Sequence, residues 1–252
     1  MKKEAAAVAG VERFLALEAR SRVLDLGCGA GRWTLELARL GHRVLGLDGD
    51  EKALSTARAA AKGERLNVHF LKADPRQIPY RGDFDAVVAL DSSFGRLPTD
   101  RDDLRCLESV RKALKPGGRL LLDLPNRERI MRHFAPNRWE PGEEGKGALV
   151  LDQASFDLEK GRLNDHRTVV APDGRRSLTL VSLRVYALTE VKAQLERAGL
   201  VYGRCWGGFD GSAYGMDSPR LLVLATAGAP VLPRTRKEPL PGSAIRIKGR
   251  RR

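Results

Sequence analysis

Residues 23–31 read Val-Leu-Asp-Leu-Gly-Cys-Gly-Ala-Gly, an apolar run with one acid that passes into glycines at positions 27, 29 and 31. Glycine lacks a Cβ, so this spacing lets the chain turn sharply after a strand and approach a ligand closely. The dinucleotide fingerprint is G-x-G-x-x-G, but here position 32 is arginine and Asp25 precedes the glycines. A carboxylate is unfavourable beside a phosphate and favourable beside an ammonium group. The loop therefore predicts either a ligand with an amino group or only a tight turn between a strand and a helix.

On both sides of this loop, from Arg22 to Leu124, short β-rich runs alternate with longer helical ones. This alternation is typical of βαβ units in a parallel sheet. One expected helix, residues 100–114, has an apolar face and ends at a Pro-Gly-Gly sequence that does not continue a helix. The expected strands cover residues 23–26, 43–47, 66–71, 84–90 and 119–124.

Acids stand at the ends of the first four expected strands: Asp25, Asp48, Asp74 and Asp91. The carboxyl ends of parallel strands meet at one edge of the sheet, and ligands of doubly wound folds bind there. An acid about 20 residues after the first glycine is the usual partner of ribose hydroxyls, and Asp48 has this position. The edge is the predicted ligand site.

After Pro125 the pattern becomes antiparallel. Three β-rich runs cover residues 149–158, 163–170 and 178–186, and a Pro-Asp-Gly turn signal separates the last two. In the third run the apolar phase changes between Leu180 and Val181, which predicts a bulge or burial of both faces. A helix from Thr189 to Gly199 and strands at 201–206 and 221–226 are expected to complete the main sheet.

Several function classes are excluded by composition. The three cysteines are far apart, and the four histidines at 42, 69, 133 and 166 show no metal-ligand spacing, so neither a disulfide framework nor a metal site is expected. The longest uncharged apolar run is too short to span a bilayer, and we expect a cytoplasmic protein without membrane association.

The formal net charge is +13, and residues 233–252 hold eight basic residues and one acid. An excess of positive charge of this size fits binding to a polyanion such as RNA. RNA-binding surfaces usually also carry aromatic residues, however, and residues 233–252 contain none. Residues 229–252, rich in proline and without an apolar period, are expected to be a disordered basic tail.

The ordered motifs from about Arg22 to Thr226 resemble those of class I S-adenosylmethionine-dependent methyltransferases. The resemblance implies that S-adenosylmethionine is the cofactor and S-adenosylhomocysteine the product. It implies that Asp25, Gly27, Gly29 and Gly31 hold the methionine part, and that Asp48 binds the ribose. It places Asp74 at the adenine amine, and Leu90 and Asp91 near the transferable methyl group.

Later motifs, Ser93-Phe94-Gly95, Pro125-Asn126-Arg127 and Phe209-Asp210-Gly211-Ser212-x-Tyr214, look like those of a bacterial subgroup in which many members act on small molecules. Two sequence elements of nucleic-acid base methyltransferases, a Pro-Cys nucleophile and an Asp/Asn-Pro-Pro-aromatic motif, are missing after the fourth strand. The resemblance therefore implies methyl transfer to a small organic acceptor. The alternative is an RNA-binding or RNA-modifying methyltransferase that uses the basic tail.

Methyl transfer from a sulfonium is an in-line displacement, for which the protein mainly aligns the acceptor. If a proton must leave the acceptor, the possible catalytic residues are Asp91, His133 and Tyr214. An exposed loop position explains His133 equally well. The loop from Trp206 to Gly215, which carries Tyr214, forms either a mobile wall of the acceptor pocket or a long connection pinned to the core by its aromatic residues.

We therefore expect an α/β protein with a doubly wound, mostly parallel, Rossmann-like sheet of seven strands and an inserted antiparallel β-sheet lid after the fifth strand. Residues 1–20 form an N-terminal helical segment, and residues 21–127 and 187–228 form the cofactor-binding domain. Residues 128–186 form the inserted strands that cover the acceptor site. The acceptor, its reacting atom, the need for a general base and the oligomeric state, including a homodimer, stay open.

Overall fold

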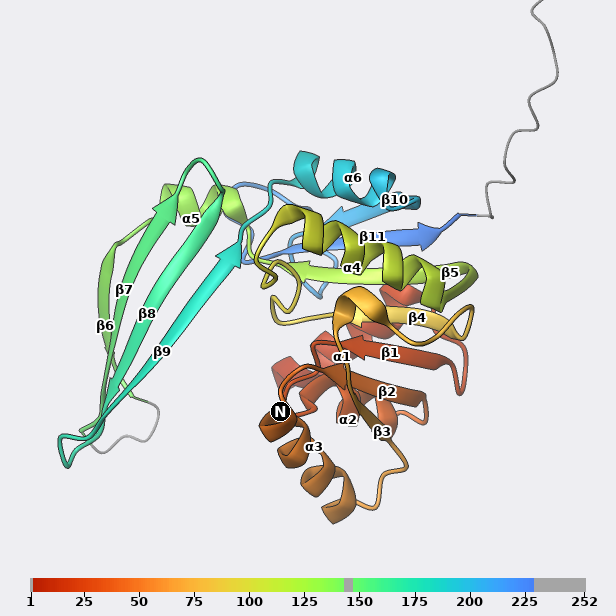
Figure 1. Cartoon of the computed structure of the whole chain (residues 1–252), viewed down its shortest axis with the longest axis horizontal. Coiled ribbons are helices and arrows are strands. Elements are labelled where there is room, and N and C mark those ends of the chain that lie inside the picture. Colours follow the sequence, from red (N-terminus) through yellow and green to blue (C-terminus); the bar gives the residue numbers. More distant parts are fainter. Residues whose placement is uncertain (1, 143–146, 229–252) are drawn as a thin grey trace, which may run out of the picture.

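The computed structural model describes residues 2–142 and 147–228 and contains two sheets (Figure 1). The expected disorder of residues 229–252 lies outside the described residues. The larger sheet has the strand order β10-β11-β5-β4-β1-β2-β3, and the smaller one has the order β6-β7-β8-β9. The larger sheet is formed by β1 (Arg22–Leu26), β2 (Arg43–Asp48), β3 (His69–Lys72), β4 (Phe84–Ala89), β5 (Leu114–Leu124), β10 (Leu200–Trp206) and β11 (Leu221–Ala227).

The first five strands are parallel, while β11 pairs antiparallel with β5 and with β10. The predicted doubly wound, seven-stranded, mostly parallel sheet is confirmed. Two apolar clusters cover its faces, one with residues of α1 and α2 and the other with residues of α4 and α6. The helices are α1 (Lys2–Leu15), α2 (Arg32–Arg39), α3 (Glu51–Gly63), α4 (Asp100–Ala113), α5 (Arg127–Arg132) and α6 (Leu188–Arg197), with a 3₁₀ turn, η1, at Pro75–Gln77.

The predicted antiparallel insertion after the fifth strand is also confirmed as a separate sheet of β6 (Asn137–Pro141), β7 (Leu149–Asp157), β8 (Arg162–Val170) and β9 (Arg176–Arg184). This sheet stands beyond the carboxyl ends of the parallel strands (Figure 1). The short strand β6 and helix α5 are found in addition to the expected elements.

The expected bulge between Leu180 and Val181 is wrong. Every residue of β9 pairs with β8 in unbroken register. Burial of both faces is wrong as well, because Leu178 and Leu180 are 63% and 64% exposed. The apolar phase changes because the outer half of β9 carries leucines on the face that no described element covers, whereas Leu183 on the other face is buried at the root of the sheet.

A buried arginine joins the inserted sheet to the body of the protein. Arg184, at the end of β9, donates to Asp100 at 3.1 Å and to Glu190 at 2.6 Å. Its backbone N–H donates to the carbonyl of Gly95 at 2.8 Å, and Arg162 donates to the carbonyl of Leu97 at 3.0 Å. The loop after β4 is thereby held by the ends of β8 and β9.

Candidate functional site

The glycine loop passes from β1 to α2 in the left-handed backbone region, with φ angles of +71° at Gly27, +53° at Gly29 and +86° at Gly31. Residues with a Cβ rarely adopt such angles. A Cβ at Gly27 would lie 2.7 Å from the Cβ of Ser93, so close packing requires glycine there as well. At Gly29 a Cβ would meet nothing within 4 Å, because this glycine borders open space.

Asp48 ends β2 and is held by backbone donors on both sides. Its Oδ2 accepts from the N–H of Gly29 at 2.8 Å, and its Oδ1 accepts from the N–H of Asp50 at 2.8 Å. A carboxylate oxygen has more than one lone pair, so both oxygens can accept further hydrogen bonds. The side chain is thereby fixed as an acceptor next to the glycine loop.

Asp25 lies beneath the loop with only 2% of its surface exposed. The hydroxyl of Thr34, on α2, donates to its Oδ2 at 2.6 Å. Burial raises the pKa of Asp25 to about 7, although the Thr34 hydrogen bond opposes this shift. A cationic group placed beside Asp25 would stabilise its ionised form.

Asp91 follows β4 in a strained turn. Asp91 and Ser92 have φ angles of +50° and +57°, which is unusual for residues with a side chain. The turn is held by Asp123 at the end of β5, whose Oδ2 accepts from the N–H of Asp91 at 3.0 Å. The Asp91 carboxylate accepts from the indole N–H of Trp33 at 2.7 Å and pairs with Arg32 at 3.3 Å.

Asp123 was not singled out from the sequence, because it lies within an apolar strand. It is 2% exposed and accepts from Arg220 at 2.5 Å. Burial raises its pKa to about 6, while Arg220 opposes the shift.

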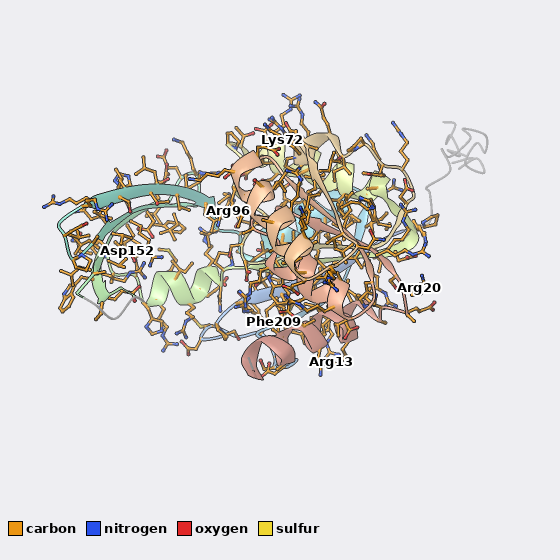
Figure 2. All side chains as sticks on the ribbon, turned by 90° about the horizontal axis from the view of Figure 1, so that it is seen from below. Arg13, Arg20, Lys72, Arg96, Asp152 and Phe209 are labelled. Atoms are coloured by element: carbon orange, nitrogen blue, oxygen red, sulfur yellow. The ribbon has the colours of Figure 1, made fainter. Side chains whose placement is uncertain are left out.

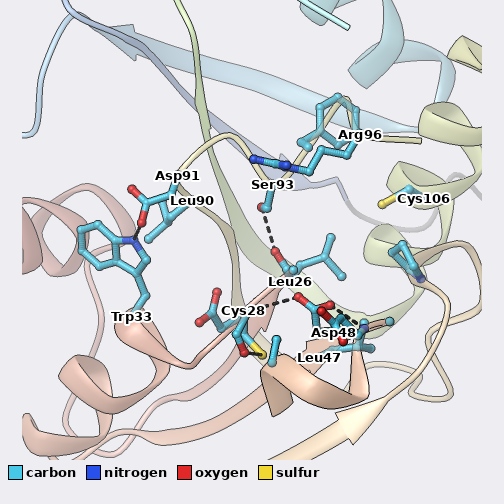
Figure 3. Close-up of a pocket in the computed structure, with 18 of the residues that line it drawn as sticks. Leu26, Cys28, Trp33, Leu47, Asp48, Leu90, Asp91, Ser93, Arg96 and Cys106 are labelled. Carbon is cyan, nitrogen blue, oxygen red and sulfur yellow. Dashed lines mark hydrogen bonds between the residues drawn. The ribbon is translucent and has the colours of Figure 1, made fainter. Parts of the chain in front are cut away.

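The glycine loop, Asp25, Asp48 and Asp91 border one cavity of about 530 Å³ at the carboxyl edge of the sheet (Figure 3). Asp123 and Arg220 stand behind Asp91 and do not line it. Of the residues predicted to bind the cofactor, the cavity brings together Asp25, Gly27, Gly29, Asp48, Leu90 and Asp91. Its remaining wall comes from the loop after β4 and from α4, and includes Phe94, Arg96, Leu97, Asp103 and Cys106. In Figure 3 the wall runs from Trp33 and Asp91 past Asp48 to Cys106.

Two predicted cofactor residues, Gly31 and Asp74, lie beside the cavity without lining it. The Asp74 carboxylate accepts from the guanidinium of Arg76, with contacts of 2.7 to 3.0 Å, and this hydrogen bonding lowers its pKa. Its neighbour Pro75 does line the cavity. A contact from Asp74 to an adenine amine would therefore have to share oxygens that already accept from Arg76.

Tyr214 and His133 also lie outside the lining of this cavity. The Tyr214 hydroxyl lies 2.5 Å from Glu128 and 3.0 Å from Asn126, at the start of α5. Burial and then the Glu128 hydrogen bond raise the pKa of Tyr214. His133 is exposed, 3.4 Å from Asp217, and lines a separate cavity of about 290 Å³ between α5 and the inserted sheet.

Asp103 on α4 is a further buried acid at the cavity wall. Tyr186 donates to its Oδ2 at 2.7 Å, and its Oδ1 has no hydrogen-bond partner among the described residues. Burial raises its pKa to about 6. No sequence signal indicated it, because it falls within the polar and apolar alternation of a surface helix.

Residues 23–118 match the family model described as a methyltransferase domain. The putative methyltransferase YqeM of Bacillus subtilis is 35% identical over 129 residues, which cover 51% of this chain and 52% of YqeM. Residues 23–118 therefore form a methyltransferase domain. The demethylmenaquinone methyltransferase of Lactococcus lactis is 36% identical over 104 residues, covering 39% of this chain and 40% of that protein.

Among solved structures, the CcbJ methyltransferase from Streptomyces caelestis has the same fold, with a TM-score of 0.80 and 24% identity over 89% of this chain and 90% of CcbJ. The likeness thus includes the inserted sheet. By sequence, the chain matches only about half or less of the length of these two curated relatives. Within residues 2–142 and 147–228, no helix is long and apolar enough to cross a membrane, and no group of three or more His, Cys, Asp or Glu residues could hold a metal ion.

Proposed function

We propose that this chain is a methyltransferase that binds S-adenosylmethionine in the 530 Å³ cavity and transfers its methyl group to a small organic acceptor by in-line displacement. The observation that carries the proposal is the meeting of the glycine loop, Asp48 and Asp91 in one cavity at the carboxyl edge. When bound, the cofactor supplies a methyl group on a positively charged sulfur, so the protein needs no electrophile of its own.

The residues present fit this cofactor. Asp48 is fixed by the N–H groups of Gly29 and Asp50 and keeps acceptor capacity for the two ribose hydroxyls. Asp25 provides a buried carboxylate whose ionisation an ammonium group would favour, and Gly29 leaves open space for the methionine part. The end of the cavity at Pro75, Leu97 and Cys106 is apolar and fits a flat base, with Asp74 and Arg76 supporting the turn behind it.

Asp91 and Leu90 lie at the end of β4, opposite Trp33, and we place the transferable methyl there. Trp33 and Arg32 both bind the Asp91 carboxylate, so its principal role in the proposal is to shape this end of the cavity. The acceptor would approach from the neighbouring end of β5, where Tyr214, Asn126 and Glu128 form a hydrogen-bonded group. Because its pKa is raised, the Tyr214 hydroxyl keeps its proton at neutral pH and does not act as a base. In the proposal its role is to orient the acceptor. His133 lies farther out, between α5 and the inserted sheet.

The cavity falls within the usual volume of small-ligand sites, roughly 300 to 1,000 Å³, as the binding of the cofactor requires. The support for a small acceptor comes from a relative. The name of the Lactococcus relative refers to methylation of demethylmenaquinone, a small organic molecule.

The test has two arms. Calorimetry should show binding of S-adenosylmethionine and S-adenosylhomocysteine, and no competition by NAD. Labelled methyl transfer to a cell extract, separated into small molecules, RNA and protein, should place the label in the small-molecule fraction. Label only in RNA would overturn the acceptor class, and the absence of cofactor binding would overturn the proposed activity.

A further inference from the structure

A second hollow lies at the edge of the larger sheet opposite the cofactor cavity, where the parallel strands begin. Arg22 and Arg43 start β1 and β2 and are direct neighbours in the parallel register. Figure 2 shows Arg20, which comes just before β1, on the side of the body away from the inserted sheet and its Asp152. The hollow has a volume of about 460 Å³ and is lined by Arg20, Arg22, Arg43, Val44, Leu45, Asn67, His69, Tyr80 and Phe84.

The fold leaves this hollow because one crossover connection lacks an α-helix. The chain passes from β1 to β2 through α2, from β2 to β3 through α3 and from β4 to β5 through α4, but from β3 to β4 with only the 3₁₀ turn η1. Val44 packs with residues of α2, so its neighbours in β2, Arg43 and Leu45, face the other side of the sheet. Leu45 packs there with the cluster that contains Phe84. Tyr80 lies against Phe84, with 5.2 Å between the ring centroids, and completes this wall.

The hollow has an excess of positive charge. No acid lines it among the described residues. Arg22 pairs with Asp83 at 3.2 Å, whereas neither Arg20 nor Arg43 has a carboxylate partner within residues 2–142 and 147–228. By contrast, Arg39 at the end of α2 pairs with two glutamates at 2.6 Å. Two guanidinium groups with free donors beside a third are complementary to an anion that carries more than one negative charge.

The lining combines donors for a phosphate with an apolar wall. A guanidinium offers parallel N–H groups that match the oxygens of a phosphate, and Asn67 and His69 add further polar groups. Leu45 and Tyr80 supply apolar surface, and tyrosine rings stack with flat heterocyclic bases. An inorganic anion would leave this wall uncovered, and a neutral ring would leave the arginines unpaired. The volume lies within the roughly 300 to 1,000 Å³ that is usual for small-ligand sites.

We propose that this hollow binds a nucleotide, with the phosphate groups at Arg20, Arg22 and Arg43 and the base against Tyr80. The site shares no lining residue with the cofactor cavity. Strands β1 and β2 connect the two sites, since each begins at an arginine of the hollow and ends beside the glycine loop. The inference does not rest on the proposed function, because none of these residues takes part in the proposed methyl transfer.

Calorimetry with ADP tests the site in the full chain, with and without an excess of S-adenosylhomocysteine. ADP should bind with the same affinity in both titrations. Adenosine, which lacks phosphate, should bind at least about 100-fold more weakly, and inorganic pyrophosphate, which lacks the base, at least about tenfold more weakly. An ADP affinity that falls when S-adenosylhomocysteine is added would place ADP in the cofactor cavity and overturn the proposal. Equal affinities for pyrophosphate and ADP would overturn the nucleotide class.

A double variant tests the two arginines without a carboxylate partner. Arg20→Gln combined with Arg43→Gln should raise the dissociation constant of ADP at least about 100-fold. The matched control is Arg101→Gln combined with Arg197→Gln, because these arginines are exposed on α4 and α6, lie outside the lining and remove the same charge. The control should keep the native affinity, and a native far-UV circular dichroism spectrum shows that each variant is folded.

Three further outcomes would overturn the proposal. The first is no binding of ADP up to about 1 mM. The second is an equal loss of affinity in the two double variants, because the effect would then follow from net charge and not from the hollow. The third is binding of a single-stranded RNA through Arg20 and Arg43 by a chain that does not bind ADP, which would favour a nucleic-acid partner.

Discussion

At the scale of single residues, Asp48 is the group on which the cofactor assignment most depends. Its two oxygens are oriented by Gly29 and Asp50, so a ribose meets an acceptor that needs no rearrangement. Asp48→Ala should weaken binding of both S-adenosylmethionine and S-adenosylhomocysteine at least tenfold, about 1.4 kcal/mol, as measured by calorimetry. Glu51→Ala is the control, because Glu51 is exposed in the first turn of α3 and lies outside the cavity lining. Equal affinities of the native protein and a folded Asp48→Ala variant would remove the ribose assignment.

Asp25 gives a pH dependence to the same binding event. Its pKa is about 7 in the free protein, so below that pH the carboxyl group must lose a proton before it can pair with an ammonium group. Affinity for S-adenosylhomocysteine should therefore rise with pH up to about 7, by up to tenfold per unit, and level off above that pH, where Asp25 is already ionised. Calorimetry from pH 5.5 to 8.5 tests this, and in Asp25→Asn the rise on the acid side should be absent.

At the scale of elements, the turn after β4 stores backbone strain that glycine would release. Ser92 has a φ of +57°, and no hydrogen bond of its side chain is present in the described structure. Ser92→Gly should stabilise the fold by roughly 1 kcal/mol, measured by urea unfolding, because the left-handed conformation costs a residue with a Cβ about that much. In Ser177→Gly, within the extended strand β9, the sign should reverse, since glycine there only adds freedom to the unfolded chain. Loss of stability in Ser92→Gly would contradict the strain argument.

The group formed by Tyr214, Asn126 and Glu128 joins the start of α5 to the loop before β11. If it orients the acceptor, Tyr214→Phe should keep the cofactor affinity and lower turnover about 100-fold. Glu128→Gln, which keeps a hydrogen-bond acceptor for the hydroxyl, should lose less. Unchanged turnover in Tyr214→Phe, with unfolding at lower urea concentration, would leave the hydroxyl with the role of a packing contact only.

The sequence predicted the elements whose signals are local. A few neighbouring residues are enough to predict three of these features: the glycine loop, the acids at the ends of four strands, and the end of α4 before Pro116. The parts that it did not predict depend on distant partners. Asp123 accepts a hydrogen bond from the backbone N–H of Asp91, which lies 32 residues away in the sequence. Arg220 donates to Asp123 across 97 residues. The outer leucines of β9 gave a false bulge because a strand pattern does not show which face of a sheet the rest of the chain covers.

At the scale of the whole molecule, three buried carboxyl groups make stability depend on pH. Burial raises the pKa of Asp25 to about 7 and those of Asp103 and Asp123 to about 6, above the ordinary value of an aspartate. Between about pH 4 and these values the folded state holds more protons than the unfolded state. The contribution of each group to stability therefore falls as pH rises, by up to about 1.4 kcal/mol per pH unit.

Asp103 tests this sign at a residue that lies at the cavity wall and is not among those predicted to bind the cofactor. Asp103→Asn keeps an oxygen that accepts from the Tyr186 hydroxyl and removes the titration. Relative to the native protein, the variant should gain stability between pH 5 and pH 7.5, because only the native protein must then bury a charge with one oxygen unpartnered among the described residues. Urea unfolding at both pH values measures the difference, and Asp173→Asn, exposed in the turn between β8 and β9, should show no such change with pH. A difference that is constant between the two pH values would mean that burial does not raise the pKa of Asp103 into this range.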